Sequence, residues 1–119
     1  MILDPNQKIT ETNKGQTLFL APEICENKPY DIKADCWAFG IILYCLLGST
    51  LPLQGRKCSE KQLRRLIVSE KFDSEPLILR QTSSSAIDLV QRLLHKEPTK
   101  RLTISAALRH QWFKNGHLQ

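Results

Sequence analysis

The 119-residue sequence predicts an all-α fold in which several helices surround one buried central helix. Apolar residues recur at helical spacing in three segments beyond residue 58, and a Ser or Thr precedes each segment at a capping position. The segment from Ala34 to Gly48 is apolar on every side, which is typical of a helix with neighbours all around it. No convincing sheet pattern appears, and the composition, 41% hydrophobic and 24% charged, is that of one folded domain.

The N-terminal part of the chain predicts a loop that leads into a short helix. Residues 1–14 are mostly polar and show no hydrophobic period. We expect an extended apolar segment from Gly15 to Pro22 and then a helical turn, because the fixed φ of Pro22 suits a first helical position. Glu23 follows, where a carboxylate complements the positive end of that helix.

Both ends of the central helix carry boundary residues. Asp35 lies near its start, where a carboxylate accepts hydrogen bonds from unpaired backbone N–H groups. Gly48 follows the last apolar residue, and we expect it to end the helix.

Three further helices are expected from capping residues followed by apolar residues of helical period. Ser59 and Gln62 have capping-box spacing, Ser83 begins a serine run, and Thr103 precedes the last apolar segment. The apolar residues predicted to face the core are Leu63, Leu66 and Ile67, then Ile87, Val90, Leu93 and Leu94, then Ile104, Ala107, Leu108 and Trp112. We expect the second helix to end near Pro98 and the third at Gly116.

Charge and cysteine content exclude several classes of function. The net charge of +5 comes from scattered Lys and Arg without a nucleic-acid-binding motif, so we expect no nucleic-acid partner. The longest apolar run has twelve residues, too few to span a bilayer, so we expect no membrane partner. The cysteines form no C-x-x-C pair and no metal set with the histidines, which favours reduced thiols in the cytoplasm or nucleus.

Three motifs then occur in one order. They are Gly15-Gln16-Thr17-Leu18-Phe19-Leu20-Ala21-Pro22-Glu23, then Asp35-Cys36-Trp37-Ala38-Phe39-Gly40, then Leu93-Leu94-His95-Lys96-Glu97-Pro98-Thr99-Lys100-Arg101. In this order they resemble the C-terminal, helical lobe of eukaryotic Ser/Thr protein kinases, including the A-P-E triplet. The ending from Arg101 to Phe113 is most similar to the calcium/calmodulin-dependent and checkpoint-kinase branch. The resemblance implies a polar loop at 1–14, a partial kinase C-lobe at 15–113 and a tail at 114–119.

The resemblance assigns a structural role to three charged residues. Glu23 and Arg101 correspond to the buried ion pair of the kinase lobe, whereas without the family each would be read as an exposed charge. Asp35 corresponds to the residue by which the central helix anchors the catalytic loop. A plain helix cap is the alternative for Asp35, and we favour it because this chain has no catalytic-loop motif.

The residues from Gly15 to Pro22 correspond to the loop that binds the protein substrate. Two of them depart from the family pattern: Gln16 stands where Thr is usual, and Phe19 where Tyr is common. The usual Thr contacts the catalytic Asp, so its replacement weakens any expectation of catalysis.

The motifs for phosphoryl transfer are absent from the 119 residues. There is no G-x-G-x-x-G, no H-R-D and no D-F-G, so ATP and Mg²⁺ are implied only for a complete parent kinase. We expect no catalytic, cofactor-binding or metal-binding residue in this chain and no activity of the chain alone. Thr10, Thr12 and Thr17 lie where a kinase carries an activating phosphosite, yet no catalytic-loop Arg is present to receive the phosphate.

Two interpretations stay open, and an unrelated helical protein is the third. The chain is a truncated Ser/Thr kinase domain whose parent phosphorylates proteins, or it is a free-standing kinase-like module that binds a protein partner. Five cations around the helix at 59–68 would suit an acidic partner, although a solvated basic face is the simpler interpretation: Arg56, Lys57, Lys61, Arg64 and Arg65. We also expect self-association through apolar surface of the central helix.

Overall fold

The computed structural model describes residues 14–114, and within this range it contains helices and loops but no strand. The predicted all-α fold is therefore confirmed. The elements are α1 (Lys14–Thr17), α2 (Pro22–Cys25), α3 (Lys33–Gly48), α4 (Glu60–Ser69), α5 (Glu75–Leu79), α6 (Ser84–Leu93), the 3-10 turn η2 (Pro98–Lys100), α7 (Ile104–Leu108) and α8 (Gln111–Lys114). Only residue 14 of the predicted loop, and only residue 114 of the predicted tail, lie in this range.

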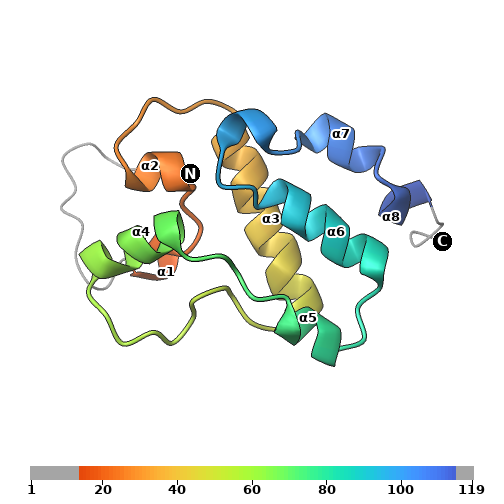
Figure 1. Cartoon of the computed structure of the whole chain (residues 1–119), viewed down its shortest axis with the longest axis horizontal. Coiled ribbons are helices and arrows are strands. Elements are labelled where there is room, and N and C mark those ends of the chain that lie inside the picture. The colour runs from red at the N-terminus through yellow and green to blue at the C-terminus, as the bar shows by residue number, and fades with distance from the viewer. Residues whose placement is uncertain (1–13, 115–119) are drawn as a thin grey trace.

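The helix α3 runs through the middle of the molecule, as Figure 1 shows. On one side, α3 packs against α5 and α6 through a cluster that includes Leu43, Tyr44 and Leu89. A second cluster, around Trp37 and Ile41 of α3, contacts the side of the molecule that holds α1, α2 and α4. The predicted central helix is thus present and divides the core into two parts.

The segment expected to be extended, Gly15 to Pro22, instead begins with the helical turn α1. Backbone bonds from Phe19 N to Gln16 O and from Leu20 N to Thr17 O, of 3.1 and 3.0 Å, close this turn. The turn places Leu18 and Phe19 against the second cluster, where an extended chain would carry alternate side chains to opposite sides. The predicted helical turn at Pro22 is present as α2, with Pro22 in its first turn.

The predicted caps of α4, α6 and α7 are confirmed. Ser59 and Gln62 form a reciprocal capping box, and Ser83 and Thr103 accept from the backbone N–H groups three residues further on. Such caps depend on a three-residue spacing that the sequence contains directly.

The cap predicted at the start of α3 was assigned to the wrong residue, whereas the predicted end at Gly48 is confirmed. At the start, Asp31 Oδ1 accepts from Lys33 N at 2.9 Å, whereas Asp35 lies inside the first turn with an exposed side chain and no capping bond. At the end, Ser49 adopts the left-handed conformation with φ of 59°, and Gly48 is the last helical residue. Gly48 is buried, and a Cβ at this position would lie 3.2 Å from Leu77 Cδ1.

The helix predicted after Thr103 is divided into α7 and α8. Backbone bonds from Arg109 N to Ala106 O and from His110 N to Ala107 O tighten the chain after Leu108. The His110 ring then accepts from Trp112 N at 3.0 Å, which starts α8 in a new direction. Leu108 is consequently exposed, contrary to the prediction, while Ala107 is fully buried. Gly116 lies outside the described residues.

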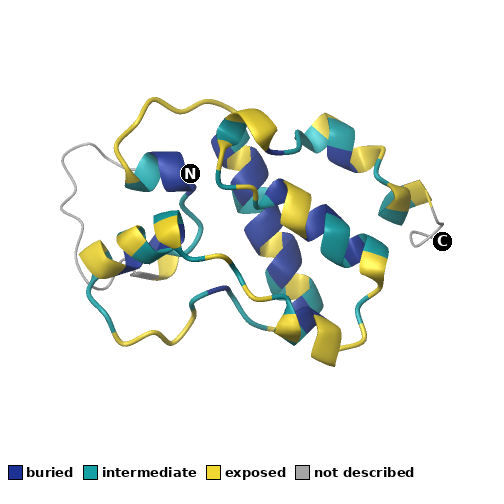
Figure 2. Cartoon of the chain, viewed as in Figure 1, coloured by how far each residue is buried: buried dark blue, intermediate teal, exposed yellow. Residues whose placement is uncertain are grey.

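One short helix was not predicted, and one face of α3 is uncovered. The helix α5, with Pro76 in its first turn, covers the end of α3 by burying Leu77. On α3 itself, Asp35, Ile42 and Leu46 are exposed, and Figure 2 shows exposed positions on this otherwise buried helix.

Candidate functional site

The most enclosed polar contact among the described residues joins α2 to the chain after η2. Arg101 Nη1 donates to Glu23 Oε2 at 2.7 Å, and Nη2 donates to Glu23 Oε1 at 2.9 Å. The two side chains are 0% and 4% exposed. The contact is a bidentate, buried ion pair across 78 residues of sequence.

All five N–H donors of the Arg101 guanidinium have acceptors. Besides Glu23, they donate to the carbonyl oxygens of His95, Lys33 and Lys96 at 2.9, 2.8 and 3.2 Å. The guanidinium also lies 5.1 Å from the centre of the Trp37 ring. A buried charge is tolerated only when its donors are paired, and here every donor is paired. Through these hydrogen bonds Arg101 connects α2, the start of α3 and the η2 region.

Lys33, the first residue of α3, also connects α3 to the η2 region. Its Nζ donates to the carbonyl oxygens of Pro98 and Arg101, both at 2.9 Å. Sequence reasoning placed no role on Lys33. Its partners lie 65 and 68 residues away, so no local pattern could have indicated them.

The segment from Gly15 to Pro22 is held by α4 as well as by this ion pair. Thr17 is buried, and its hydroxyl donates to Glu60 Oε1 at 3.1 Å. Arg64 Nε donates to the same oxygen at 2.5 Å. Burial of Thr17 makes this hydroxyl a structural contact and leaves it inaccessible to a phosphorylating enzyme, while Thr10 and Thr12 lie outside the described residues.

Glu60 and Arg64 were missed as members of this site. Their i, i+4 spacing on a capped helix was readable from the sequence and predicts an ion pair. The contact with Thr17, which lies 43 residues earlier, was not readable in this way.

Other predicted positions of this segment differ in their exposure. Gly15 and Gln16 are exposed, Leu18, Phe19 and Leu20 are half-buried, and Ala21 and Pro22 are buried. The segment therefore presents a polar N-terminal part to solvent and anchors its C-terminal part in the core. Asp35 lies elsewhere, on the exposed face of α3, and its side chain makes no hydrogen bond within the described part of the chain.

Two groups near the ion pair have shifted pKa values. Burial raises the pKa of the Cys25 thiol to about 11, so this cysteine is a poor nucleophile. Burial also lowers the pKa of Lys96 to about 8, because its ammonium is removed from water. The four cysteines are free thiols in the structure.

The described residues do not fit a nucleotide–magnesium site. Within residues 14–114, no group of three or more His, Cys, Asp or Glu side chains could hold a metal ion. No glycine-rich loop is available to surround phosphates. In the same range, no helix is long and apolar enough to cross a membrane.

The fold and the buried pair define this class of protein as a helical kinase-type lobe, and comparisons with known proteins identify the family. Residues 2–113 match the protein kinase domain, so the chain belongs to the protein kinase family. The chain corresponds to part of such a domain, and its resemblance to the calcium/calmodulin-dependent and checkpoint-kinase branch is confirmed by its relatives.

Several relatives are Ser/Thr kinases. Death-associated protein kinase 2 of Homo sapiens is 43% identical over 98 residues, which cover 82% of this chain and 26% of the relative. Serine/threonine-protein kinase cds1 of Schizosaccharomyces pombe is 36% identical over 109 residues, covering 87% of this chain and 23% of the relative. The chain thus spans about a quarter of the length of these relatives.

Solved kinase structures also match this chain over only part of their own length. A twitchin kinase fragment of C. elegans has a TM-score of 0.76 and 30% identity, and the match covers 100% of this chain and 26% of that structure. The Rad53 kinase domain in complex with AMPPNP has a TM-score of 0.71 and 31% identity, covering 82% of this chain and 38% of that structure.

Proposed function

We propose that this chain is the substrate-binding part of a Ser/Thr protein kinase domain and transfers no phosphate on its own. The buried Glu23–Arg101 pair carries the proposal. It fixes the end of the segment Gly15 to Pro22, which in a kinase faces the protein substrate, onto the last helices of the lobe. Because Thr17 also contacts Glu60 of α4, this segment has two independent supports.

The expected lack of activity rests on the sequence. Phosphoryl transfer needs groups that hold the ATP phosphates and Mg²⁺ and a base that orients the hydroxyl, and the 119 residues contain none of the motifs that supply them. A complete parent protein would phosphorylate Ser or Thr of proteins with ATP and Mg²⁺. This chain would contribute the surface that positions the peptide.

The proposal is tested by titrating the purified 119-residue chain with ATP and Mg²⁺ and by assaying phosphate transfer to a Ser/Thr peptide. Circular dichroism first establishes that the chain is helical, and an active protein kinase is the positive control. We expect a folded chain without nucleotide binding or transfer. Micromolar ATP binding, or any transfer that survives further purification, would contradict the proposal.

A second function, binding of an acidic protein partner, is favoured by one observation. Lys57, Lys61 and Arg65 are exposed near α4 and have no ion pair within the described residues. Arg56 and Arg64, in contrast, already pair with Glu70 and Glu60. These three unpaired cations, two on α4 and one in the loop before it, would attract a carboxylate-rich segment of a partner.

Binding of a fluorescent acidic peptide at two salt concentrations tests this alternative. We expect the double variant Lys61→Glu/Arg65→Glu to abolish the salt-dependent part of the binding. Arg109→Glu, at an exposed position after α7, is a control because it also reverses a cationic charge. Equal loss in both variants would mean that net charge, and not the α4 surface, attracts the peptide.

We place the protein inside the cell, in the cytoplasm or nucleus. The free thiols and the kinase relatives support this location. Imaging of the tagged chain tests it, and secretion would contradict it.

A further inference from the structure

A cavity of about 450 Å³ lies between α6, the end of α3 and the chain that joins α4 to α5. Its volume falls within the range of about 300 to 1,000 Å³ that is usual for small-molecule sites. We call it the α6 pocket. It is separate from the segment Gly15 to Pro22, because none of those residues lines it.

The walls of the α6 pocket are two antiparallel stretches of chain. One wall is a single face of α6 and its C-cap, formed by residues at helical spacing: Ile87, Val90, Gln91 and Leu94. The other wall is the chain from Ser69 to Leu77. Gln91 Nε2 donates to Ser74 Oγ at 3.1 Å, and Lys96 Nζ donates to Ile67 O, so higher residue numbers on one wall meet lower numbers on the other.

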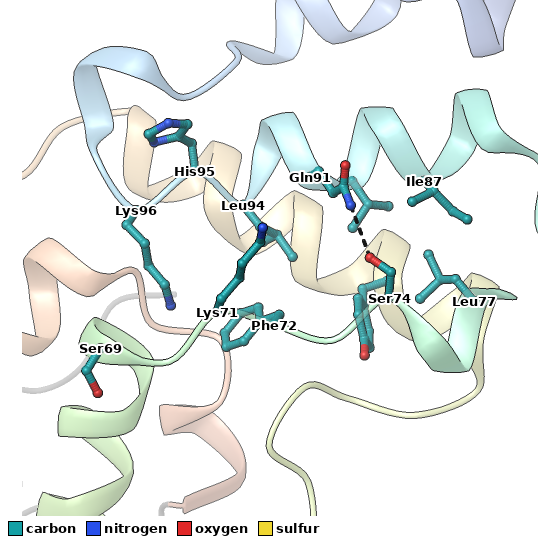
Figure 3. A pocket seen from close by; sticks show the side chains of 12 residues that line it. Ser69, Lys71, Phe72, Ser74, Leu77, Ile87, Gln91, Leu94, His95 and Lys96 are labelled. Atoms are coloured by element: carbon teal, nitrogen blue, oxygen red, sulfur yellow. Dashed lines mark hydrogen bonds between the residues drawn. The ribbon is translucent and has the colours of Figure 1, made fainter.

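The two ends of the α6 pocket differ in chemistry. Leu77 and Ile87 form an apolar end, whereas Lys71, His95 and Lys96 lie toward the opposite end, as Figure 3 shows. From Ile87 to Leu93, the last residue of α6, six residues of helical rise cover about 9 Å, and the cationic end lies beyond Leu93. No carboxylate side chain lines the cavity. The pocket is therefore a short apolar slot with a cationic end.

The cations at that end have little other charge to pair with. Lys71 is exposed and makes no ion pair within the described residues. The neighbouring carboxylate of Glu70 is engaged by Arg56, and that of Asp73 accepts from Glu75 N.

The side chain of Lys96 is partly buried, and it forms no ion pair with a carboxylate in the described part of the chain. Its Nζ lies 4.3 Å from the centre of the Phe72 ring and donates to a backbone carbonyl. Burial lowers its pKa to about 8, and an anion beside it would offset that desolvation.

We propose that the α6 pocket binds an amphiphilic carboxylate with an unbranched apolar chain. The carboxylate of the ligand lies at the cationic end of the pocket, beside Lys71 and Lys96. Its apolar chain passes Gln91 and Ser74 and reaches the apolar end at Leu77 and Ile87. The two ends are more than about 9 Å apart, a length that an extended chain of about ten carbons can span. The site does not depend on phosphoryl transfer or on the substrate-binding segment.

Calorimetric titration of the folded 119-residue chain tests the chemistry of the ligand. The probes are decanoate, decanol and decyltrimethylammonium, each used below its aggregation threshold. We expect decanoate to bind with one-to-one stoichiometry and about tenfold more tightly than either of the others. Equal affinities, or several molecules bound per chain, would overturn the proposal, because general adsorption to apolar surface gives that result.

Variants test the position of the site. Lys71→Glu changes an exposed residue without a side-chain bond and should weaken decanoate binding about tenfold while the thermal melt is unchanged. Lys61→Glu makes the same charge change on α4, outside the pocket, and should leave binding within about twofold of the wild-type value.

A third variant blocks the α6 pocket, and a fourth tests whether decanoate binds instead to the exposed face of α3. Gln91→Trp fills the middle of the pocket from an exposed position and should abolish binding. Ile42→Gln alters the exposed face of α3 and should change nothing. Undiminished binding by Gln91→Trp, or loss of binding by Ile42→Gln, would show that decanoate binds elsewhere and would refute the proposal.

Discussion

The two faces of α3 are similar in composition and opposite in environment. Trp37 and Ile41 are fully buried, while Ile42 and Leu46 are 47% and 75% exposed. Adjacent isoleucines of one helix thus differ by nearly half of their accessible surface, and Figure 2 shows both environments along α3.

An apolar helix is buried only where other parts of the chain cover it. The face with Trp37 and Ile41 meets α2, α4 and the Arg101 network, whereas no described element covers Ile42 and Leu46. Asp35 shares the uncovered face, and the anchoring contact that the family resemblance implies for its side chain has no partner within residues 14–114. The covered face should respond strongly to substitution and the uncovered face weakly.

The largest effect is expected where the ion pair closes the covered face. Glu23→Gln leaves the buried Arg101 charge without a counter-charge and should lower the free energy of unfolding by about 3 to 5 kcal/mol. Urea unfolding followed by circular dichroism measures this loss. Glu26→Gln is the matched control, since its exposed pair with Lys28 should contribute less than about 1 kcal/mol. Similar losses in the two variants would mean that burial of the first pair adds nothing.

The adjacent isoleucines allow the most direct test of the comparison. Ile41→Ala should cost about 2 to 5 kcal/mol, because it opens a cavity in a fully buried cluster. Ile42→Ala removes the same atoms from a half-exposed position and should cost less than about 1 kcal/mol. The same unfolding measurement compares them, and a large loss in Ile42→Ala would reveal a cover on the second face.

The two glycines of α3 differ in how closely neighbouring helices approach them, α6 at Gly40 and α5 at Gly48. A Cβ at Gly40 would lie 2.8 Å from Leu93 Cβ and 2.8 Å from Leu94 Cδ2, so Gly40→Ala should force the helices apart and cost about 1 to 3 kcal/mol. At Gly48 the nearest atom is the flexible end of Leu77, at 3.2 Å. Gly48→Ala should therefore be neutral, or stabilising by up to about 1 kcal/mol through helix propensity. Equal melting temperatures would contradict the tight α3–α6 contact.

A smaller effect is expected away from α3, where Asp88 joins α6 to α8. The hydrogen bond from His110, with Oδ2 2.7 Å from Nε2, and then the bond from Arg92 hold the pKa of Asp88 below its usual value of about 3.9. A carboxyl whose pKa is lower in the folded state adds stability above its unfolded pKa. That stability is lost as the pH falls through the folded value.

The pH dependence of unfolding of Asp88→Asn measures this contribution. Because Asp88 is 44% exposed, we expect a loss of less than about 1 kcal/mol at pH 6 that disappears as the pH falls below the folded pKa of Asp88. Glu75→Gln, at an exposed carboxylate without an ion pair in the described range, is the control. A constant difference between Asp88→Asn and the wild type at all pH values would exclude the charge as its origin.

The smallest effect on unfolding is expected at the most exposed residue of the uncovered face. Leu46→Gln should change the free energy of unfolding by no more than about 0.5 kcal/mol. We propose, however, that this face drives self-association, so the variant should reduce the oligomer fraction in sedimentation velocity. The wild type sedimenting only as a monomer at high concentration would refute the self-association proposal.

Much of the fold was accessible from local patterns. Ser59 with Gln62, Ser83 and Thr103 were placed correctly because a cap and its N–H partner are three residues apart. The family motifs also indicated the pairing of Glu23 with Arg101, which the structure brings together. The start of α3 was less accessible: Asp31 accepts from Lys33 N, although Asp35 matched the usual residue preferences of a cap better, whereas the helix ends at Gly48 as expected.

Spacing and motif order are local properties, so the sequence alone indicated that the chain is helical, where α2, α4, α6 and α7 begin, and to which family it belongs. Only the tertiary structure decided which face of α3 is covered, that Thr17 contacts Glu60, and that Lys71 and Lys96 line one pocket. Thr17 and Glu60 are 43 positions apart in the sequence, and Lys71 and Lys96 are 25 positions apart. Their partners are set by packing of the whole chain, which no short window of sequence contains.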